Sequence, residues 1–498
     1  RGSGLRGRRR RSRQRIGARV AKMIITALGN WKPKPGRLLE WHPTVDAVRV
    51  ARAAPVHPAP PSFLQEDHLR AAAAAAERGD AHHAYTGVAT EIDGVLDRDA
   101  LSRAIAAYVL RHEGLRCWFD VDHTVVHRRL AEPAVASFEP REAGAFDSDE
   151  QFQQYVRSRF SAEATAFEWP GFVVGAIERE DGFTLYYGAD HAYTDGGSQA
   201  LVISELADLY ALETGAEAPV PAPAGSHLDY AVQERDRAAQ YDADSPEISA
   251  WRDAFAKNHG KMPRFPLDLG LAEGERGQVR VAERHLLDAE ETAAFERACK
   301  AAGARISSGI FAAVAVTDHE LAGRESYFGI TMLSTRHLGD YGQSQGWFVN
   351  FAPVAFDVAD ARTFSEVAAR AHDEFDRAKQ IGEAPVHAVL GALAADGTLG
   401  SELAVSPNML SYIDFRWFPG VGRPADARAR HFTGEGSTSN ASMWVNRDHE
   451  NLYLCAQIPD NPTAAESVER YHDHLQNVLS TVARQGEYAV RTVDKVGS

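Results

Sequence analysis

The chain has 498 residues, of which 44% are hydrophobic and 25% charged, enough for two or three globular domains with sizeable cores. No apolar run approaches the roughly 20 residues that a membrane-spanning helix needs, so a soluble protein is expected. Three cysteines, Cys117, Cys299 and Cys455, are too few and too far apart for a disulfide framework or a zinc site. We therefore expect a reducing, cytoplasmic location and no bound metal.

Positive charge is concentrated at the start of the chain. Residues 1–22 contain nine Arg and one Lys without an acidic residue, whereas the rest carries 44 basic and 69 acidic side chains, a net charge of −25. Such an arm can bind nucleic acid or anionic lipid. We favour Met23 as the natural start and residues 1–22 as a disordered basic leader, because this segment has nothing to bury. The acidic body argues against nucleic-acid binding.

The first half is predicted to mix helices and strands. The Pro-rich residues 31–61 are expected to be irregular and to lie over a surface. A helix is predicted from Ser62, whose hydroxyl can cap it, through an alanine run to Gly79. Apolar residues at three- and four-residue spacing predict another helix over 99–110. Further elements expected in this half are strands at 117–119, 172–177 and 183–188 and a helix at 198–213.

Alternating prolines mark the clearest domain boundary. Residues 216–225 cannot join a helix or a central strand, so they are expected to form a stiff extended linker. Elements expected after it are a strand at 284–287, helices at 288–303 and from Ser307, strands at 328–333, 347–356 and 452–458, and an amphipathic helix at 464–484. We predict two α/β lobes, 23–215 and 246–498, joined by a linker at 216–245.

One short motif has the residue types of an active site. The sequence His191-Ala-Tyr-Thr-Asp-Gly follows an apolar strand and precedes a helix, so His191 is expected on a loop facing a cleft. Neutral imidazole, with an ordinary pKa of about 6.5, can accept a proton near neutral pH. Asp195 can fold the loop back through a salt bridge, and Gly196 and Gly197 permit torsions closed to other residues. The motif also fits a loop histidine that caps the next helix.

Longer sequence words surround this motif. In chain order they are Trp31-Lys-Pro-Lys-Pro-Gly36, Trp41-His42, Arg111-His-Glu-Gly-Leu-Arg116, Phe265-Pro-Leu-Asp-Leu-Gly270, Ala301-Ala-Gly-Ala-Arg305, Ser334-Thr-Arg336, Gly346-Trp-Phe-Val-Asn350, Ser442-Met-Trp-Val-Asn-Arg447 and Pro459-Asp-Asn-Pro462. From about Ile25 to residue 490 the chain thereby resembles the polyketide-associated (Pap-type) acyltransferases, relatives of nonribosomal peptide condensation domains and of chloramphenicol acetyltransferase.

This resemblance implies a fold and a reaction. The fold is a V-shaped pair of chloramphenicol-acetyltransferase-like lobes with the active site in a tunnel between them. An acyl thioester, on coenzyme A or on a phosphopantetheinyl carrier protein, reaches the tunnel from one face and the nucleophile from the other, and no further cofactor is implied. His191 takes the family's active-site position, as general base or as a group that positions the attacking hydroxyl or amine.

The resemblance also implies roles for the neighbours of His191. Asp195 is structural and pairs with an arginine of the second lobe, for which Arg336 stands at the expected place. Gly196 lets the loop keep its shape. Trp347 and Asn350 belong to the segment that crosses between the lobes, and they are expected to form walls of the tunnel.

The sequence departs from its relatives at two places. Asp190 stands where many peptide condensation domains have the first of two consecutive histidines, which favours ester over amide formation. Asp414-Phe-Arg-Trp417 resembles the Asp-Phe-Gly-Trp motif of plant acyltransferases only superficially and fits an ordinary strand end. Five further histidines are scattered without ligand spacing and receive no metal role: His42, His68, His82, His83 and His112.

We expect a free-standing O-acyltransferase that esterifies a hydroxyl of a lipid, glycolipid or natural-product intermediate. The sequence contains no recognisable adenylation domain, carrier domain or phosphopantetheine serine motif, so the donor arrives in trans. Two alternatives stay open. One is a free-standing condensation enzyme that forms an amide or ester from a carrier-bound aminoacyl group, and the other is a catalytically silent binding module. A cytoplasmic monomer is expected, peripheral to the membrane where the acceptor is a lipid.

Overall fold

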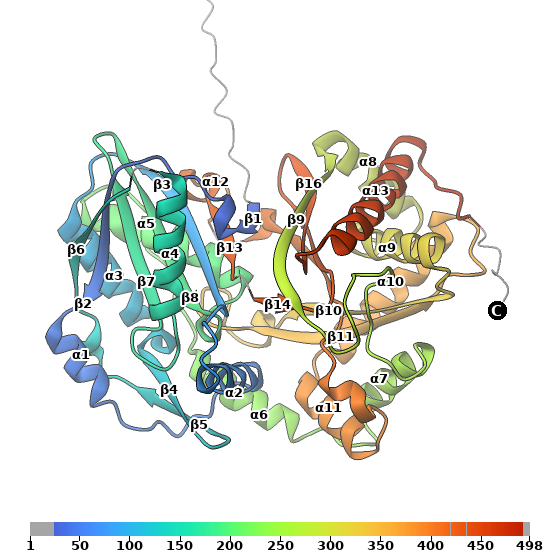
Figure 1. Cartoon of the computed structure of the whole chain (residues 1–498), viewed down its shortest axis with the longest axis horizontal. Coiled ribbons are helices and arrows are strands. Elements are labelled where there is room, and N and C mark those ends of the chain that lie inside the picture. The colour runs from blue at the N-terminus through green and yellow to red at the C-terminus, as the bar shows by residue number, and fades with distance from the viewer. Residues whose placement is uncertain (1–23, 147, 419, 435, 492–498) are drawn as a thin grey trace, which may run out of the picture.

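The computed structural model describes residues 24–146, 148–418, 420–434 and 436–491. They form two α/β halves that lie side by side (Figure 1), so the mixed α/β class predicted from the sequence is confirmed. The predicted basic leader, residues 1–22, lies outside the described residues.

A seven-stranded sheet, in the order β1-β13-β3-β8-β7-β2-β6, is the centre of the first half. Its strands are β1 Ile24–Ala27, β2 Arg37–Pro43, β3 Tyr85–Asp93, β6 Phe138–Ala145, β7 Phe172–Glu178, β8 Gly182–Asp190 and β13 Arg430–Thr433. β8 is buried along its whole length between β3 and β7. Because side chains alternate along a strand, Leu185 and Tyr187 face one hydrophobic cluster and Tyr186 faces another.

Helices cover both faces of this sheet. α3 Arg98–Arg111 and α5 Gly196–Glu213 contribute to the cluster that contains Leu185, and α4 Asp149–Glu163 contributes to the one that contains Tyr186. β8 therefore lies between two layers of helices, and the His191 motif begins at its carboxyl end.

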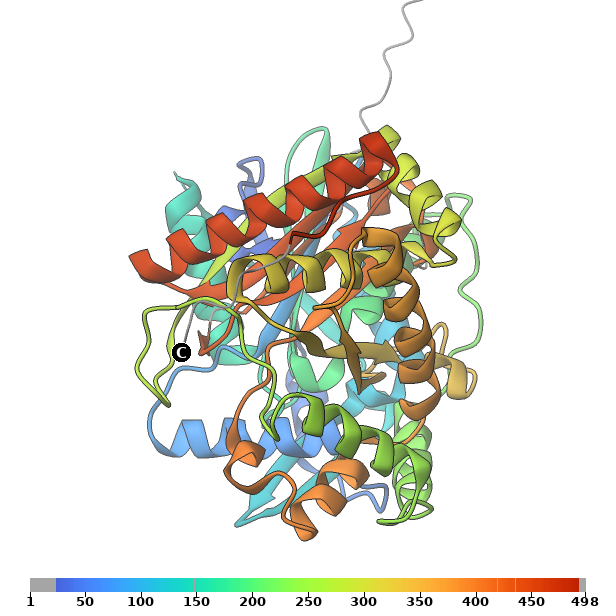
Figure 2. The same ribbon diagram turned by 90° about the vertical axis from the view of Figure 1, so that its right-hand side faces the viewer.

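The second half has a five-stranded sheet, β12-β15-β16-β9-β14, and a strand pair, β10-β11, which an isolated bridge between Ile330 and Met409 connects to it. Its strands are β9 Gly277–Asp288, β10 Ser326–Ser334, β11 Val349–Asp357, β12 Leu410–Asp414, β14 Ser437–Thr438, β15 Ser442–Arg447 and β16 Asn451–Pro459. Helices α8 Ala289–Ala301, α9 Ile306–Ala322, α10 Phe364–Ile381 and α13 Pro462–Gln485 share one core with these strands (Figure 2).

The remaining elements border the space between the halves or the outer edges. They are α1 Val45–Arg52, α2 Phe63–Glu77, β4 Cys117–Asp122, β5 Val125–Leu130, α6 His227–Ala238, α7 Pro246–Lys257, α11 Val386–Ala395 and α12 Pro424–Ala427. Short 3₁₀ helices are η1 Leu28–Asn30, η2 Glu113–Arg116, η3 Pro133–Val135, η4 His191–Tyr193, η5 Arg336–Leu338, η6 Gly400–Ala404 and η7 Phe415–Trp417.

Most helices and strands predicted from the sequence are present. The helix predicted from Ser62 is α2, and a capping box fixes its start: Gln65 N donates to Ser62 Oγ, and Ser62 N donates to Gln65 Oε1. The irregular segment predicted at 31–61 is wrong, because it contains β2 and α1. The prolines flank this stretch, and the apolar run that includes Trp41 is buried between β6 and β7.

A strand from the second half of the sequence lies in the sheet of the first half. Residues 216–226 contain neither helix nor strand, but the predicted linker at 216–245 also includes α6. β13, from the second half of the sequence, pairs with β1 and β3 in the first sheet (Figure 1). The division into contiguous lobes at 216–245 stays a prediction, and β13 is one segment that crosses it.

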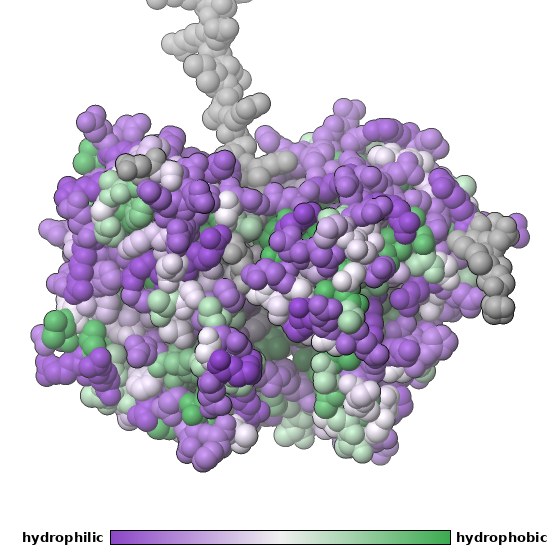
Figure 3. Space-filling view, in the orientation of Figure 1, coloured by the Kyte–Doolittle hydropathy of each residue, from purple (hydrophilic) through white to green (hydrophobic). Residues whose placement is uncertain are grey.

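The face seen in Figure 3 is largely hydrophilic, and the hollow between the halves on this face contains hydrophobic residues. No single helix among the described residues is long and apolar enough to cross a membrane. The bent pair α8 and α9, with 90° between its two helices, passes the same test by length and composition.

The crossing strand provides a test of how the halves depend on each other. Phe432 of β13 is 1% exposed and its ring lies 4.8 Å from that of Trp31. We expect Phe432→Ala to lower the free energy of unfolding by about 3–5 kcal/mol and to increase hydrogen exchange in β1 and β3. Trp417→Ala, in η7 before β13 and 81% exposed, is the control and should change neither quantity. Unchanged exchange in β3 of the Phe432 variant would contradict a structural role for the crossing strand.

Candidate active site

The His191 motif connects the buried strand β8 to helix α5. Asp190 is the last residue of β8, η4 covers His191–Tyr193, and α5 begins at Gly196 with Asp195 as its N-cap. His191 N donates to Ala84 O over 2.9 Å, which fixes the backbone at the histidine. The loop is therefore held at both ends by regular structure.

The imidazole of His191 is partly buried against aromatic rings. Its centroid lies 4.1 Å from the Trp347 ring and 6.4 Å from the His68 ring. His191 Nδ1 is enclosed, without a hydrogen-bond partner among the described residues. Burial lowers the pKa of His191 and the neighbouring His68 lowers it further, while the backbone carbonyl of His191 acts in the opposite direction. The imidazole is therefore neutral near pH 7 and able to accept a proton.

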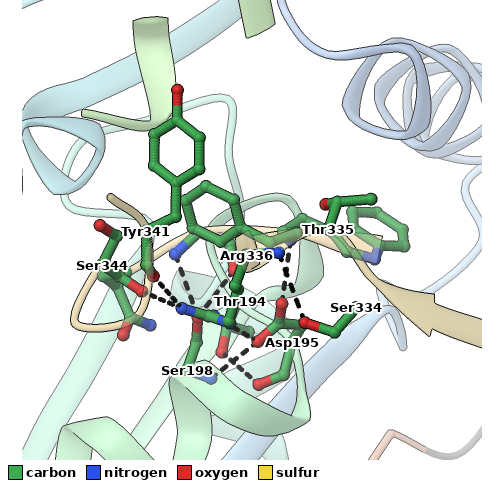
Figure 4. A network of polar contacts seen from close by, with 12 residues as sticks. Thr194, Asp195, Ser198, Ser334, Thr335, Arg336, Tyr341 and Ser344 are labelled. Atoms are coloured by element: carbon green, nitrogen blue, oxygen red, sulfur yellow. Dashed lines mark hydrogen bonds and ion pairs between the residues drawn. The ribbon is translucent and has the colours of Figure 1, made fainter. Parts of the chain in front are cut away.

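An ion pair joins the motif to the second half of the molecule (Figure 4). Arg336 Nη2 donates to Asp195 Oδ1 over 2.8 Å and to Ser198 Oγ over 2.7 Å. Arg336 Nη1 donates to the carbonyl oxygens of Tyr341 and Ser344 over 2.9 and 2.7 Å. The pairing that the family resemblance implies for Asp195 and Arg336 is present, and four acceptors fix the guanidinium.

Backbone groups complete the environment of Asp195. Ser198 N donates to its Oδ1 over 2.7 Å, which caps α5, and Phe348 N donates to its Oδ2 over 2.9 Å. Burial raises the pKa of Asp195, but the Arg336 charge and the two N–H donors outweigh it and hold this pKa below its ordinary value. Asp195 therefore both caps α5 and pairs with Arg336. The helix cap that the sequence analysis offered as an alternative role for the histidine is made by Asp195.

The two motif glycines differ from the sequence-based expectation. Neither has a positive φ, and a Cβ on Gly196 would meet no atom within 4 Å, so the freedom of Gly196 is not what shapes the loop. A Cβ on Gly197 would lie 3.0 Å from Arg336 Nε and 3.4 Å from Asp195 Oδ1. A side chain would therefore crowd the ion pair at Gly197 and not at Gly196.

Trp347 and Asn350 have different surroundings. The Trp347 ring contacts the His191 ring, and its place in the wall of a tunnel stays a prediction. Asn350 is 6% exposed, and its Nδ2 donates to Gly382 O and Ala384 O over 2.7 Å each. Its Oδ1 accepts from Val386 N over 3.0 Å. Asn350 thus holds the connection between α10 and α11.

Three residues near the motif were not assigned a role from the sequence: His68, His82 and Gln65. His68 Nε2 lies 2.6 Å from Asp190 Oδ1, and His82 Nε2 lies 3.3 Å from Asp190 Oδ2. α2 brings His68 here because Gln65, one turn earlier, donates to Ala192 O over 2.7 Å. One sequence signal could have indicated these contacts. Asp190 is an acidic residue at the end of a buried strand, and a buried carboxylate requires hydrogen-bond or ionic partners.

The word Arg111-His-Glu-Gly also supports the motif. His112 Nε2 lies 2.9 Å from Glu205 Oε2 of α5, and Arg111 pairs with the same carboxylate. Gln345 N donates to His112 Nδ1 over 3.4 Å, and Gln345 Nε2 donates to Tyr193 O over 3.3 Å. This network connects α3, α5 and the segment before β11, to which Gln345 belongs, next to the motif.

Other candidates have structural positions. Asp414 pairs with Arg416 directly after β12, while Trp417 is exposed, which fits the strand-end interpretation of this segment. Within the described ranges no group of three or more His, Cys, Asp or Glu side chains is arranged to hold a metal ion.

Comparisons with known proteins agree with this geometry. Residues 72–410 match the condensation-domain family. The chain is 32% identical over 492 residues to the 2'-acyl-2-O-sulfo-trehalose (hydroxy)phthioceranyltransferase PapA1 of Mycobacterium tuberculosis, covering 96% of this chain and 92% of that protein. It is 30% identical over 474 residues to the trehalose-2-sulfate acyltransferase PapA2 of Mycobacterium bovis, covering 92% of this chain and 97% of that protein.

Solved structures show the same fold. The PapA2 acyl transferase structure superposes with a TM-score of 0.81 at 27% identity, covering 92% of this chain and 99% of that chain. The first condensation domain of the calcium-dependent antibiotic synthetase superposes with a TM-score of 0.63 at 20% identity, covering 86% of this chain and 97% of that chain. The two-lobed arrangement is shared with these structures.

The buried ion pair generates one prediction. Asp195→Ala leaves the guanidinium of Arg336, which is 15% exposed, without its carboxylate and leaves two N–H groups unpaired. We expect the free energy of unfolding to fall by about 3–5 kcal/mol in chemical denaturation. Glu213→Ala removes the exposed pair with Arg103 and should change it by about 0–1 kcal/mol. Equal unfolding curves for wild type and the Asp195 variant would exclude a stabilising pair.

The adjacent glycines provide a second, closely matched comparison. Gly197→Ala places its Cβ 3.0 Å from Arg336 Nε. The guanidinium is fixed by four acceptors and would have to shift by a few tenths of an ångström, so we expect the free energy of unfolding to fall by about 1–3 kcal/mol. Gly196→Ala places a methyl group in open space and should change it by less than about 0.5 kcal/mol. Thermal unfolding of the two variants side by side measures the difference. The prediction fails if Gly196→Ala is as destabilising as Gly197→Ala.

Proposed function

Since the chain belongs to the condensation-domain family and is an acyltransferase, we propose that it moves an acyl group from a thioester donor to a sugar hydroxyl of a glycolipid, with His191 as general base. The observation that carries the proposal is the partly buried imidazole of His191, whose pKa is lowered by burial and whose ring packs against that of Trp347 from the second half of the chain.

The chemistry requires one proton acceptor and a fixed geometry. The hydroxyl oxygen attacks the thioester carbonyl carbon, its proton passes to His191, the carbon–sulfur bond breaks, and the thiolate takes the proton. A thioester already has a good leaving group, so no acyl-enzyme intermediate is needed. Alignment of the two substrates supplies roughly 7–11 kcal/mol, and a positioned base contributes about 10²–10⁴-fold.

The carboxylates beside His191 are engaged elsewhere, which favours the histidine as the base. Both oxygens of Asp195 accept hydrogen bonds, from Ser198, Phe348 and Arg336. Both oxygens of Asp190 accept backbone N–H groups. Because Nδ1 of His191 is enclosed, we assign proton transfer to its Nε2.

The relatives support the choice of acceptor. PapA1 and PapA2 are named for transfer to sulfated trehalose derivatives, and the chain aligns with nearly their whole length. We propose that the donor is acyl-coenzyme A or an acyl carrier protein that arrives in trans and that transfer takes place in the cytoplasm. The buried free thiols Cys117, Cys299 and Cys455 fit a reducing compartment.

Replacing the base tests the proposed function. We expect His191→Ala to lower the rate of acyl transfer by about 10²–10⁴-fold with an unchanged melting temperature, because the enclosed Nδ1 of His191 has no hydrogen-bond partner in the described part of the chain that the substitution would strand. His123→Ala removes a histidine whose side chain is 95% exposed and serves as the control. Intact-mass detection of acylated trehalose and trehalose-2-sulfate, with acyl-coenzyme A and acyl carrier protein as donors, measures transfer.

The same assay separates the alternatives. Wild-type rates in the His191 variant would exclude the base, whereas a loss below tenfold would assign His191 a positioning role. Transfer to amines but not to sugars would favour the condensation enzyme. A wild-type protein inactive with every donor and acceptor would favour the binding module.

A further inference from the structure

Among the described residues, the imidazole of His191 makes a close ring contact but no hydrogen bond to another residue. Its centroid lies 4.1 Å from that of the Trp347 ring, with 38° between the two planes. The carbonyl of His191 itself raises the pKa of the ring, but an interaction within one residue does not tie the imidazole to the rest of the molecule. Trp347 is therefore the neighbour that can fix the direction of this ring.

A histidine acts as a base only when the nitrogen that takes the proton points at the substrate. In catalytic triads a carboxylate bonded to the other nitrogen gives the ring its direction. Both carboxylates beside His191 have other partners, because Asp195 binds Arg336 and Asp190 lies against His68. The direction of the His191 ring therefore depends on packing.

The backbone on both sides of Trp347 is fixed by hydrogen bonds to α5. Gly346 N donates to Ser198 Oγ over 3.1 Å, and Ser198 Oγ donates to Gly346 O over 2.7 Å. Phe348 N donates to Asp195 Oδ2 over 2.9 Å. The residues before and after Trp347 are thus bound to the same helix start that follows the His191 motif.

The carbonyl of Trp347 is held by a buried histidine of α6. His227 is 2% exposed, and its Nε2 lies 3.2 Å from Trp347 O. Burial lowers the pKa of His227 to about 3, so its ring is neutral near pH 7. Because a carbonyl oxygen can only accept a hydrogen bond, the single ring proton of His227 is on Nε2. The His227 ring also packs edge-on against Phe348 at 4.9 Å.

Gly346 leaves the space that this contact needs. Its φ is +154°, in the region that favours glycine. A Cβ at this position would lie 2.3 Å from His227 Cδ2, so any side chain would push the imidazole away from Trp347 O. The positions of Gly346, Trp347 and His227 are therefore set together.

We infer that Trp347 is a positioning residue that orients the imidazole of His191 through their ring contact, and that His227 holds Trp347 in place through its carbonyl. The inference rests on the proposed role of His191 as general base. The His68 ring meets the Trp347 ring edge-on at 5.8 Å, so the indole packs against two imidazoles. Without the indole the base keeps its chemistry but loses its direction, which lowers kcat more than it changes KM.

Replacement of the indole tests the first part of the inference. Trp347→Leu removes the ring, and we expect kcat to fall by about 10²-fold with little change in KM. Trp347→Phe keeps an aromatic ring and should retain most of the rate. Trp118→Leu is the control, because it removes a partly buried tryptophan of β4 whose ring contacts Arg129, and it should leave kcat unchanged.

A pair of variants at His227 tests the second part. His227→Leu removes the donor to Trp347 O and should lower kcat by about tenfold. His227→Gln keeps an N–H donor in a side chain of similar reach, so it should restore most of the wild-type kcat. A role of His227 in packing alone would not distinguish the leucine variant from the glutamine variant in this way.

Proton NMR of protein labelled with carbon-13 histidine follows the His191 ring without turnover. Its carbon-bound protons lie close to the indole, whose ring current displaces their resonances from those of free histidine. The His191 signals are identified by their absence in His191→Ala. We expect this displacement in the wild type, its loss in Trp347→Leu and His227→Leu, and its return in His227→Gln.

The outcomes separate the inference from the proposed function. Undisplaced His191 signals in the wild type, or a raised KM with unchanged kcat in Trp347→Leu, would overturn the role of the indole. A glutamine variant of His227 as slow as the leucine variant would overturn the role of His227. If the His191 signals shift in Trp347→Leu while kcat stays at the wild-type value, the ring contact stands and the base assignment falls.

Discussion

The ion pair between Asp195 and Arg336 is the interaction on which the site depends. It connects a loop at the end of β8 to the segment before β11, so the geometry around His191 requires both halves of the chain. Both partners are largely shielded from water, and each is satisfied by further hydrogen bonds. Removal of either partner would leave a charge stranded at low dielectric, which is why such a pair can hold a loop in one conformation.

The seven-stranded sheet also depends on both halves of the sequence, because it contains the crossing strand β13. β13 takes residues from the second half of the sequence into the seven-stranded sheet, while residues 336–348 bring Arg336 and the Phe348 N–H to the first half's loop. Two separate connections constrain the relative position of the halves more than one would. A fixed relative position of the halves is what the alignment of two reactants would require.

Short-range sequence patterns predicted those helices and strands whose formation depends on residues close together in the chain. The capping box before α2 and the apolar run of β8 were readable because helix caps and buried strands leave signals within a few residues. β13 has four residues and a partner more than 300 positions away, so no local pattern marks it. β2 was missed because flanking prolines dominated the interpretation of 31–61, although Trp41 and its neighbours form a buried strand.

The residues of the candidate site also fall into those that the sequence could identify and those that only the folded chain reveals. His191 and Asp195 could be identified from their motif, and Arg336 from the family resemblance, but the steric demand falls on Gly197 because only the folded chain brings the guanidinium against it. His68 was one of several scattered histidines because helix periodicity shows which face it occupies and not what that face meets.

The two acidic residues beside His191 have opposite arrangements. Asp195 is compensated by a permanent cation, the guanidinium of Arg336, whereas Asp190 accepts two backbone N–H groups and lies against the imidazoles of His68 and His82. Both carboxylates raise the pKa of His191, and burial together with His68 lowers it. The net direction is downward, so the neutral ring is obtained even with two negative charges nearby. The Asp195–Arg336 pair therefore maintains the shape of the site, and burial, the largest of these effects, keeps the His191 ring neutral within that shape.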